Sequence, residues 1–128
     1  FVTMCGICAL LLAPAERREA VRLEVTTQSL CLCHRGPDYT GVWTLPDHPQ
    51  FSSCIAHTRL AIVSPESGSQ PIVDSKENIV LGVNGEIYNH QELRREYGWR
   101  SITLSDCEVI MHLYSSGLDK KELLNKLR

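Results

Sequence analysis

The chain has 128 residues, of which 43% are hydrophobic and 22% charged, a composition typical of one globular domain and not of a disordered segment. Its formal net charge is -2 and its lysines and arginines are scattered, which argues against nucleic-acid and lipid-surface partners. The most apolar stretch, residues 4–13, is too short to span a bilayer and follows no cationic residue, so we expect neither a membrane span nor a secretory signal.

Six cysteines are the next feature that bears on the class of protein. In an exported chain they could form a disulfide framework, but without an export signal we expect reduced thiols. This favours a cytoplasmic protein with small, neutral partners. The cysteines are Cys5, Cys8, Cys31, Cys33, Cys54 and Cys107.

The N-terminal third predicts a strand followed by a helix. Residues 4–12 form an apolar run ended by Pro14, which favours a strand buried on both faces, with a short helix as the alternative. Residues 15–33 predict a helix that ends before the turn-forming residues 35–38. Its apolar face is expected to contain Ala20, Leu23, Leu30 and Cys31.

The middle and the end of the chain mix strands and helices. Two strand pieces, 54–56 and 60–63, are expected around a break at 57–59, then a loop over 64–71 and a buried strand over 79–83. Two helices should begin at Asn89 and Ser105, each with a glutamate three positions later as a capping partner. The second would bury Val109, Ile110, Leu113 and Tyr114, and a further short helix should begin at Asp119. The mixture predicts an α+β class.

Cys5 is the first candidate for chemistry. At the head of a buried strand, a lone thiol is usually a small apolar core group. If Met4 is removed, however, Cys5 becomes the first residue, and its own α-amine, with a pKa of about 8, can act as the base for its thiol. One residue then supplies both nucleophile and base.

Two cysteine pairs offer a different hypothesis. Cys5 with Cys8, and Cys31 and Cys33 with His34, could supply four ligands to a structural zinc, or the first pair could serve redox chemistry. The spacing of the second pair differs from that of common zinc ribbons, and the first pair lies in an apolar run instead of a turn. We therefore expect no metal site.

Three other positions that could belong to a site each have an ordinary structural interpretation. Arg59 is either an edge cation or a clamp for a carboxylate, because a guanidinium can bind a carboxylate through two hydrogen bonds. Asn84-Gly85 between apolar runs is a strong hairpin signal, and Asp106 can simply favour the positive end of its helix. Four histidines show no shared pattern and are expected to be structural: His34, His57, His90 and His112.

Six segments taken together resemble the class II glutamine amidotransferase domain of the asparagine synthetase family. They are residues 4–7, 34–38, 57–63, 70–71, 83–89 and 105–108, and they occur in that family's order and at similar spacings. The combination is far more specific than any one segment. The resemblance implies the fold of N-terminal-nucleophile hydrolases, in which two antiparallel sheets pack face to face between helices.

The resemblance also implies a role for each matching residue. The thiol of Cys5 would attack the side-chain amide of glutamine, and the Asn84 side chain with the Gly85 backbone N–H would hold the oxyanion. Arg59 would bind the substrate carboxylate, and Asp106 its ammonium group. The remaining glutamine-binding positions implied are Glu86 and the backbone of Leu60, Ala61, Ile62 and Val63.

By the same resemblance, residues 4–128 would be part of a glutaminase domain, with residues 1–3 as an extension ahead of the nucleophile. The ammonia would pass to a synthetase domain, absent from this sequence, that uses ATP and magnesium to activate aspartate. No cofactor is expected in the glutaminase domain itself, and a homodimer is left open. The chain alone is expected to be marginally stable, because a sheet without partner strands exposes edges.

Two alternatives to a glutaminase remain. A non-catalytic domain of the same fold, used for binding or assembly, would keep the residues ahead of Cys5. A zinc-stabilised interaction module would contain near-stoichiometric metal.

Overall fold

The computed structural model describes residues 5–60, 68–76, 78–101 and 103–128, which form two compact units. Unit 1 contains residues 5–60, 69–71 and 82–84, and unit 2 contains residues 68, 72–76, 78–81, 85–101 and 103–128. Each unit combines helix with antiparallel sheet, which confirms the α+β class. None of the helices within these ranges has the length and apolar character that a bilayer-spanning helix needs.

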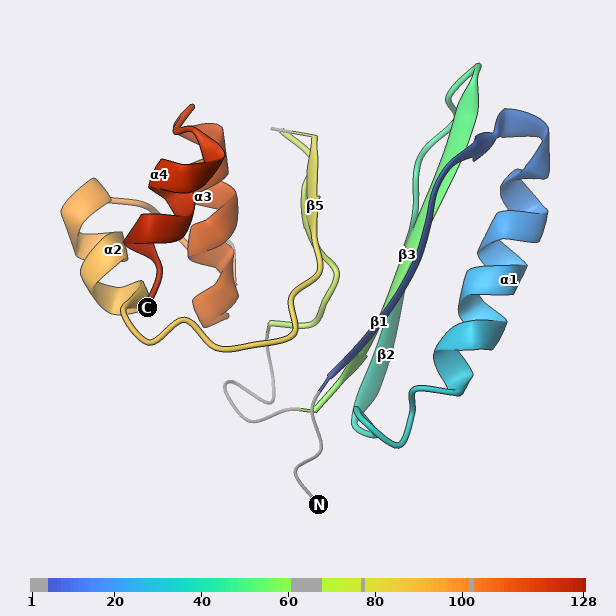
Figure 1. The fold of residues 1–128 in the computed structure, drawn as a ribbon, viewed down its shortest axis with the longest axis horizontal. Coiled ribbons are helices and arrows are strands. Elements are labelled where there is room, and N and C mark those ends of the chain that lie inside the picture. Colours follow the sequence, from blue (N-terminus) through green and yellow to red (C-terminus); the bar gives the residue numbers. More distant parts are fainter. Residues whose placement is uncertain (1–4, 61–67, 77, 102) are drawn as a thin grey trace. The chain divides into compact units, whose positions relative to one another are not determined.

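Unit 1 is built on a three-stranded antiparallel sheet with the strand order β1-β3-β2. Its strands are β1 (Gly6–Pro14), β2 (Tyr39–Thr44) and β3 (Phe51–Arg59), and α1 (Arg18–Leu30) lies along one side of them (Figure 1). The sequence did not predict β2. The predicted break at residues 57–59 is wrong, because β3 pairs with both neighbours there, with Gly6 and Thr40 both opposite Thr58.

β1 agrees with the predicted strand, but its burial differs from the prediction. Ile7 is 39% exposed and Leu11 is 65% exposed, whereas Ala13 is buried. The expectation of burial on both faces is therefore wrong, because within unit 1 the helix α1 packs on one face only. An irregularity between Leu10 and Ala13, with φ of 57° at Leu12, also breaks the alternation of β1.

The helix predicted after β1 is present, as a short 3₁₀ turn η1 (Ala15–Arg17) followed by α1. Its predicted apolar face is wrong, since Leu23 and Leu30 are exposed. The buried stripe contains Val21, Val25 and Ser29, which are four residues apart and face the sheet residues Ala13, Cys54 and Ala56. Ser29 can be buried because its hydroxyl donates to the carbonyl of Thr26 at 2.7 Å.

Unit 2 contains a two-stranded antiparallel sheet made of β4 (Ile72–Asp74) and β5 (Ile79–Leu81). β5 confirms the strand predicted over 79–83, although it is shorter and only half-buried. β4 lies outside the sequence prediction. The hairpin interpretation of Asn84-Gly85 is wrong, because the strand that pairs with β5 precedes it in the chain.

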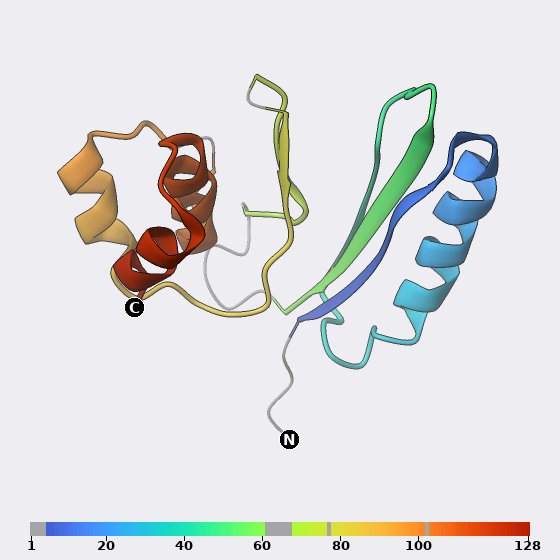
Figure 2. The same cartoon turned by 45° about the horizontal axis from the view of Figure 1, so that its top comes forward.

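The helices of unit 2 pack against one another around one apolar core (Figure 2). They are α2 (His90–Tyr97), the 3₁₀ turn η2 (Asp106–Glu108), α3 (Val109–Ser115) and α4 (Lys120–Lys126). The core residues are Leu93, Val109, Leu113 and Leu123. Two residues of the predicted stripe on α3 are not buried, since Ile110 is half-buried and Tyr114 is 60% exposed.

The predicted helix starts are confirmed, but the caps differ. The Ser105 hydroxyl accepts a hydrogen bond from the N–H of Cys107 at 3.3 Å, as an N-cap should. The side chain of Asn89 does not cap α2. It instead donates to the carbonyl of Lys126 at 2.7 Å and accepts from the N–H of Arg128 at 3.0 Å, so it ties the end of the described chain to α2.

Candidate functional site

Cys5 lies at the start of β1 and is half-buried. Its sulfur accepts a hydrogen bond from the backbone N–H of Leu60 at 3.3 Å, and its carbonyl accepts one from Nε of Arg35 at 3.3 Å. The next residue, Gly6, has no room for a side chain, because a Cβ would overlap Leu32 and Thr58. The main chain at Cys5 is therefore held on both sides, and its thiol is oriented toward Leu60.

Arg59 is the last residue of β3 and is only 7% exposed. Its carbonyl accepts a hydrogen bond from the N–H of Asp38 at 3.1 Å, so the strand end is anchored. The interpretation of Arg59 as an exposed edge cation is wrong. A guanidinium that is buried away from water needs hydrogen-bond acceptors in its place. A substrate carboxylate can serve as such an acceptor.

The backbone of Val83 is held by two side chains of unit 1. Its N–H donates to Oε1 of Gln70 at 2.6 Å, and its carbonyl oxygen lies 2.9 Å from Nε2 of His57. His57 was expected to be structural, and Gln70 had no predicted role. Both hydrogen bonds join residues that are 13 or 26 positions apart, so no local pattern in the sequence indicates them.

Burial lowers the pKa of His57, and the nearby positive charge of Arg59 adds to this effect. The hydrogen bond to the carbonyl of Val83 acts in the opposite direction; its effect is smaller than that of burial and larger than that of Arg59. His57 is consequently neutral at pH 7. Because a carbonyl only accepts, the proton of the neutral ring is assigned to Nε2.

Asn84, Gly85 and Glu86 follow Val83 and are all exposed. They form no strand. A Cβ built on Gly85 would meet no atom within 4 Å, so packing does not require glycine there. The exposed backbone is open to a ligand, which is the condition that an oxyanion donor must meet.

Asp106, the first residue of η2, is 8% exposed. Its Oδ2 accepts a hydrogen bond from the N–H of Ile87 at 2.6 Å, and the neighbouring thiol of Cys107 lies 3.5 Å from the carbonyl oxygen of Gly85. Within unit 2, Asp106 and Cys107 therefore hold the segment 85–87. The interpretation of Asp106 as a charge at a helix end does not explain this contact.

A buried carboxylate, Glu108, organises the turn that carries Asp106. Glu108 has no exposed surface, and its Oε2 accepts hydrogen bonds at 2.6 Å from both the N–H and the hydroxyl of Thr103. Its other oxygen, Oε1, lies 3.1 Å from Nε2 of His112, and Nη2 of Arg94 lies 4.0 Å from Oε2. The sequence predicted Glu108 only as a capping partner for Ser105. Its actual partners hold the loop before η2.

Arg94 strengthens the same turn, because it donates to the carbonyl of Ser105 at 2.6 Å. The Glu108 cluster, defined as Arg94, Thr103, Glu108 and His112, thus lies directly beside the predicted site residue Asp106.

The predicted site residues divide between the units. Unit 1 contains Cys5, Arg59, Leu60 and Asn84, and it brings Cys5 and Leu60 into contact. Unit 2 contains Gly85, Glu86 and Asp106. The predicted backbone contacts of Ala61, Ile62 and Val63 lie outside the described residues.

The described part of the chain gives no support to a zinc site. Within it, no group of three or more histidine, cysteine, aspartate or glutamate side chains is placed to hold a metal ion. None of the six cysteines, all of which lie in the described residues, forms a disulfide. The thiol of Cys8 lies 3.5 Å from the side-chain oxygen of Gln28 in α1, while that of Cys5 contacts Leu60.

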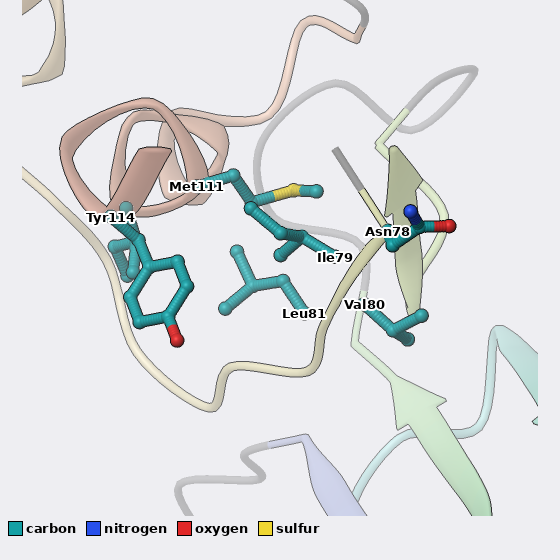
Figure 3. A pocket seen from close by; sticks show the side chains of 7 residues that line it. Asn78, Ile79, Val80, Leu81, Met111 and Tyr114 are labelled. Carbon is teal, nitrogen blue, oxygen red and sulfur yellow. The ribbon is translucent and has the colours of Figure 1, made fainter. Parts of the chain in front are cut away.

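Unit 2 also has an open apolar cavity of about 320 Å³ between β5 and α3 (Figure 3). Ile79 and Leu81 face it from the strand, and Met111 and Tyr114 face it from the helix. Among the predicted site residues that the structure describes, none lines this cavity. Its walls offer apolar surface and no nucleophile.

Comparison with known proteins gives one family and several relatives. A family model described as a glutamine amidotransferase domain matches residues 4–127. The chain is 44% identical over 124 residues to the glutamine-hydrolysing asparagine synthetase 1 of Arabidopsis thaliana, which covers 95% of this chain and 20% of the relative. It is 45% identical over 127 residues to the glutamine-hydrolysing asparagine synthetase of Asparagus officinalis, again covering 95% of this chain and 20% of the relative.

A third relative, the glutamine-hydrolysing asparagine synthetase of Sandersonia aurantiaca, is 48% identical over 113 residues, which are 87% of this chain and 20% of the relative. The chain thus spans about a fifth of the length of these curated relatives.

Proposed function

The chain belongs to the family of glutamine amidotransferase domains, and from this premise we propose that it hydrolyses the side-chain amide of glutamine with Cys5 as the nucleophile. The family match over residues 4–127 is the main support for this proposal, because it includes every residue assigned to the reaction. The contact of the Cys5 thiol with the backbone of Leu60, the residue that follows the buried Arg59 in the chain, is consistent with it.

In the proposed mechanism, the sulfur of Cys5 forms a bond to the amide carbon of glutamine. The α-amine of Cys5, exposed by removal of the residues ahead of it, takes the thiol proton and delivers it to the leaving nitrogen. The carbon–nitrogen bond then breaks, ammonia leaves, and a thioester remains on Cys5. Water cleaves the thioester, which yields glutamate and restores the thiol.

The tetrahedral intermediate carries a negative oxygen that needs hydrogen-bond donors. We assign the side-chain amide of Asn84 and the backbone N–H of Gly85 to this task. Both residues are exposed, as donors to a bound substrate must be before it binds. Loss of one such donor typically costs about 3 kcal/mol of activation free energy.

Recognition of glutamine needs opposite charges for its two ends. We assign Arg59 to the α-carboxylate and Asp106 to the α-ammonium group. One oxygen of Asp106 already accepts from Ile87, so its other oxygen is the one that we assign to substrate. Glu86 and the backbone of Leu60, Ala61, Ile62 and Val63 complete the proposed contacts.

The use of the ammonia is a further part of the proposal. The relatives are named glutamine-hydrolysing asparagine synthetases, so we propose that the ammonia passes to a synthetase domain that activates aspartate with ATP and magnesium. We assign the binding of ATP and magnesium to that synthetase domain. A cytoplasmic location belongs to the same proposal, in keeping with six cysteines that form no disulfide.

Glutamine hydrolysis by Cys5 variants tests the proposal. Glutamate and ammonia are measured after incubation of the protein with glutamine, for the wild type, Cys5→Ala and the matched control Cys31→Ala, whose thiol is exposed and has no assigned role. We expect Cys5→Ala to abolish hydrolysis while still binding glutamine, and Cys31→Ala to keep wild-type rates. Activity retained in Cys5→Ala would reject the mechanism, and an inactive wild type with an uncleaved N-terminus would favour a non-catalytic domain.

A further inference from the structure

Val83, the residue that precedes Asn84, has both of its backbone polar groups held by buried side chains. Gln70, 8% exposed, accepts a hydrogen bond from the N–H of Val83 at 2.6 Å, and Nε2 of His57, fully buried, lies 2.9 Å from the carbonyl oxygen of Val83. One residue of an exposed loop thus has both backbone polar groups bound from the interior of unit 1. Such a pair of contacts holds a backbone more rigidly than either alone.

The two side chains are themselves held in place. His57 lies in the middle strand β3, with Ile7 of β1 and Gly41 of β2 opposite it in the register. The backbone of Gln70 packs directly on β2, since a Cβ at Gly41 would overlap the carbonyl oxygen of Gln70. The contacts with Val83 therefore connect it to the centre of the sheet.

A fixed Val83 carbonyl also restricts the position of Asn84, because the two residues share a peptide bond. The carbonyl of Val83 and the nitrogen and Cα of Asn84 belong to one planar peptide unit. A hydrogen bond that fixes the direction of this carbonyl fixes the plane, and with it the position of the Asn84 Cα from which the side chain extends. The remaining freedom of Asn84 is then limited to its own dihedral angles.

We infer that His57 and Gln70 are positioning residues: Gln70 holds the N–H of Val83 and His57 its carbonyl, so that the side chain of Asn84, the next residue, can donate to the oxyanion. This inference rests on the proposed function, because it assigns to Asn84 the role given there. A displacement of about 1 Å in a catalytic group can cost on the order of 100-fold in rate, so loss of either hydrogen bond should be visible in kcat.

The substitutions follow from the two hydrogen bonds. Gln70→Met removes the acceptor at similar length, and His57→Leu removes the donor. His57→Gln keeps an N–H donor near the position of Nε2 and serves as the conservative control. We expect Gln70→Met and His57→Leu each to lower kcat about 10- to 100-fold with little change in KM, and His57→Gln to restore most of the activity.

Double substitution with Asn84→Ala separates positioning from general structural damage. If His57 and Gln70 act through Asn84, then Gln70→Met and His57→Leu will have little further effect on kcat once Asn84 is alanine. If they act by stabilising the fold, each will lower kcat by the same factor in both backgrounds, and the inference is overturned. A wild type without glutaminase activity would instead reject the proposed function, so the two failures are distinguishable.

Discussion

The two units hold their predicted site residues in different ways. In unit 1, Cys5 immediately precedes β1 and Arg59 ends β3, so the backbone pairing of these two strands places both residues. In unit 2, Asp106 lies in a turn whose loop is held by side chains, above all Glu108 and Arg94. Strand pairing places its end residues almost regardless of neighbouring side chains, whereas a side-chain network depends on each member.

This difference predicts which substitutions outside the site residues should lower the stability of the fold. A change of side chain near Cys5 leaves the register of β1 and β3 in place, because backbone hydrogen bonds define it. A change at Glu108 removes the acceptor for Thr103 and the partner of His112 and Arg94 together. A substitution at Glu108 should therefore lower the free energy of unfolding more than a substitution of a side chain near Cys5.

The largest effect is expected for Glu108→Ala, which leaves buried donors and a cation without their acceptor. Loss of one partner from a buried ionic cluster costs about 3–5 kcal/mol in the free energy of unfolding. Trp99, which stacks on His112 at 5.0 Å, reports on this unit in urea unfolding of a Trp43→Phe background. The matched control is Glu122→Ala, an exposed residue of α4.

A cost below about 1 kcal/mol for Glu108→Ala, or an equal cost for Glu122→Ala, would contradict the importance given to the Glu108 cluster.

A smaller effect is expected in the apolar core of unit 1. Val25 is 1% exposed and Leu23 is 69% exposed, although both are apolar residues of α1. We expect Val25→Ala to lower the free energy of unfolding by about 2 kcal/mol, and Leu23→Ala by less than about 0.5 kcal/mol. Urea unfolding followed by Trp43 fluorescence compares them. The reverse order would mean that the other face of α1 is the buried one.

The smallest effect is a pH dependence at His57. Its folded-state pKa lies below the ordinary value of 6.5, so the unfolded chain binds the proton more readily. This contribution to stability is fully present above that ordinary value and is lost as the pH falls through it toward the folded-state pKa. The loss cannot exceed about 1.4 kcal/mol per pH unit.

Urea midpoints of the wild type and His57→Gln, measured from about pH 7.5 to about pH 5.5, test this expectation. The wild type should lose more stability on acidification than the variant. Parallel pH profiles would show that His57 does not titrate in this way.

Much of the fold could be predicted from the sequence, because its signals are local. Strand β1, the helix that includes α1, and the starts of the helices at Ser105 and Asp119 all follow from apolar runs, caps and turn residues near in sequence. The short strands β2 and β4 could not be predicted, since they depend on pairing with β3 and β5. The buried face of α1 likewise depends on which side meets the sheet.

The candidate site also has a part that the sequence predicts and a part that it does not. The six segments of the family pattern include each residue assigned to glutamine. The residues that hold them were missed or misread, because their contacts join distant positions. Gln70 and His57 meet at Val83, and Glu108 binds Thr103 where a capping bond to Ser105 was expected.

The central claim is that Cys5 combines the nucleophile with its own amine, and the terminus of the active protein tests this most directly. The protein is purified from its source by following glutamine hydrolysis. Its N-terminal residue is then identified by mass spectrometry and N-terminal sequencing. We predict that the active chain begins at Cys5 and has a free α-amine there. Full glutamine hydrolysis by a chain that still has Phe1 to Met4 ahead of Cys5 would contradict it.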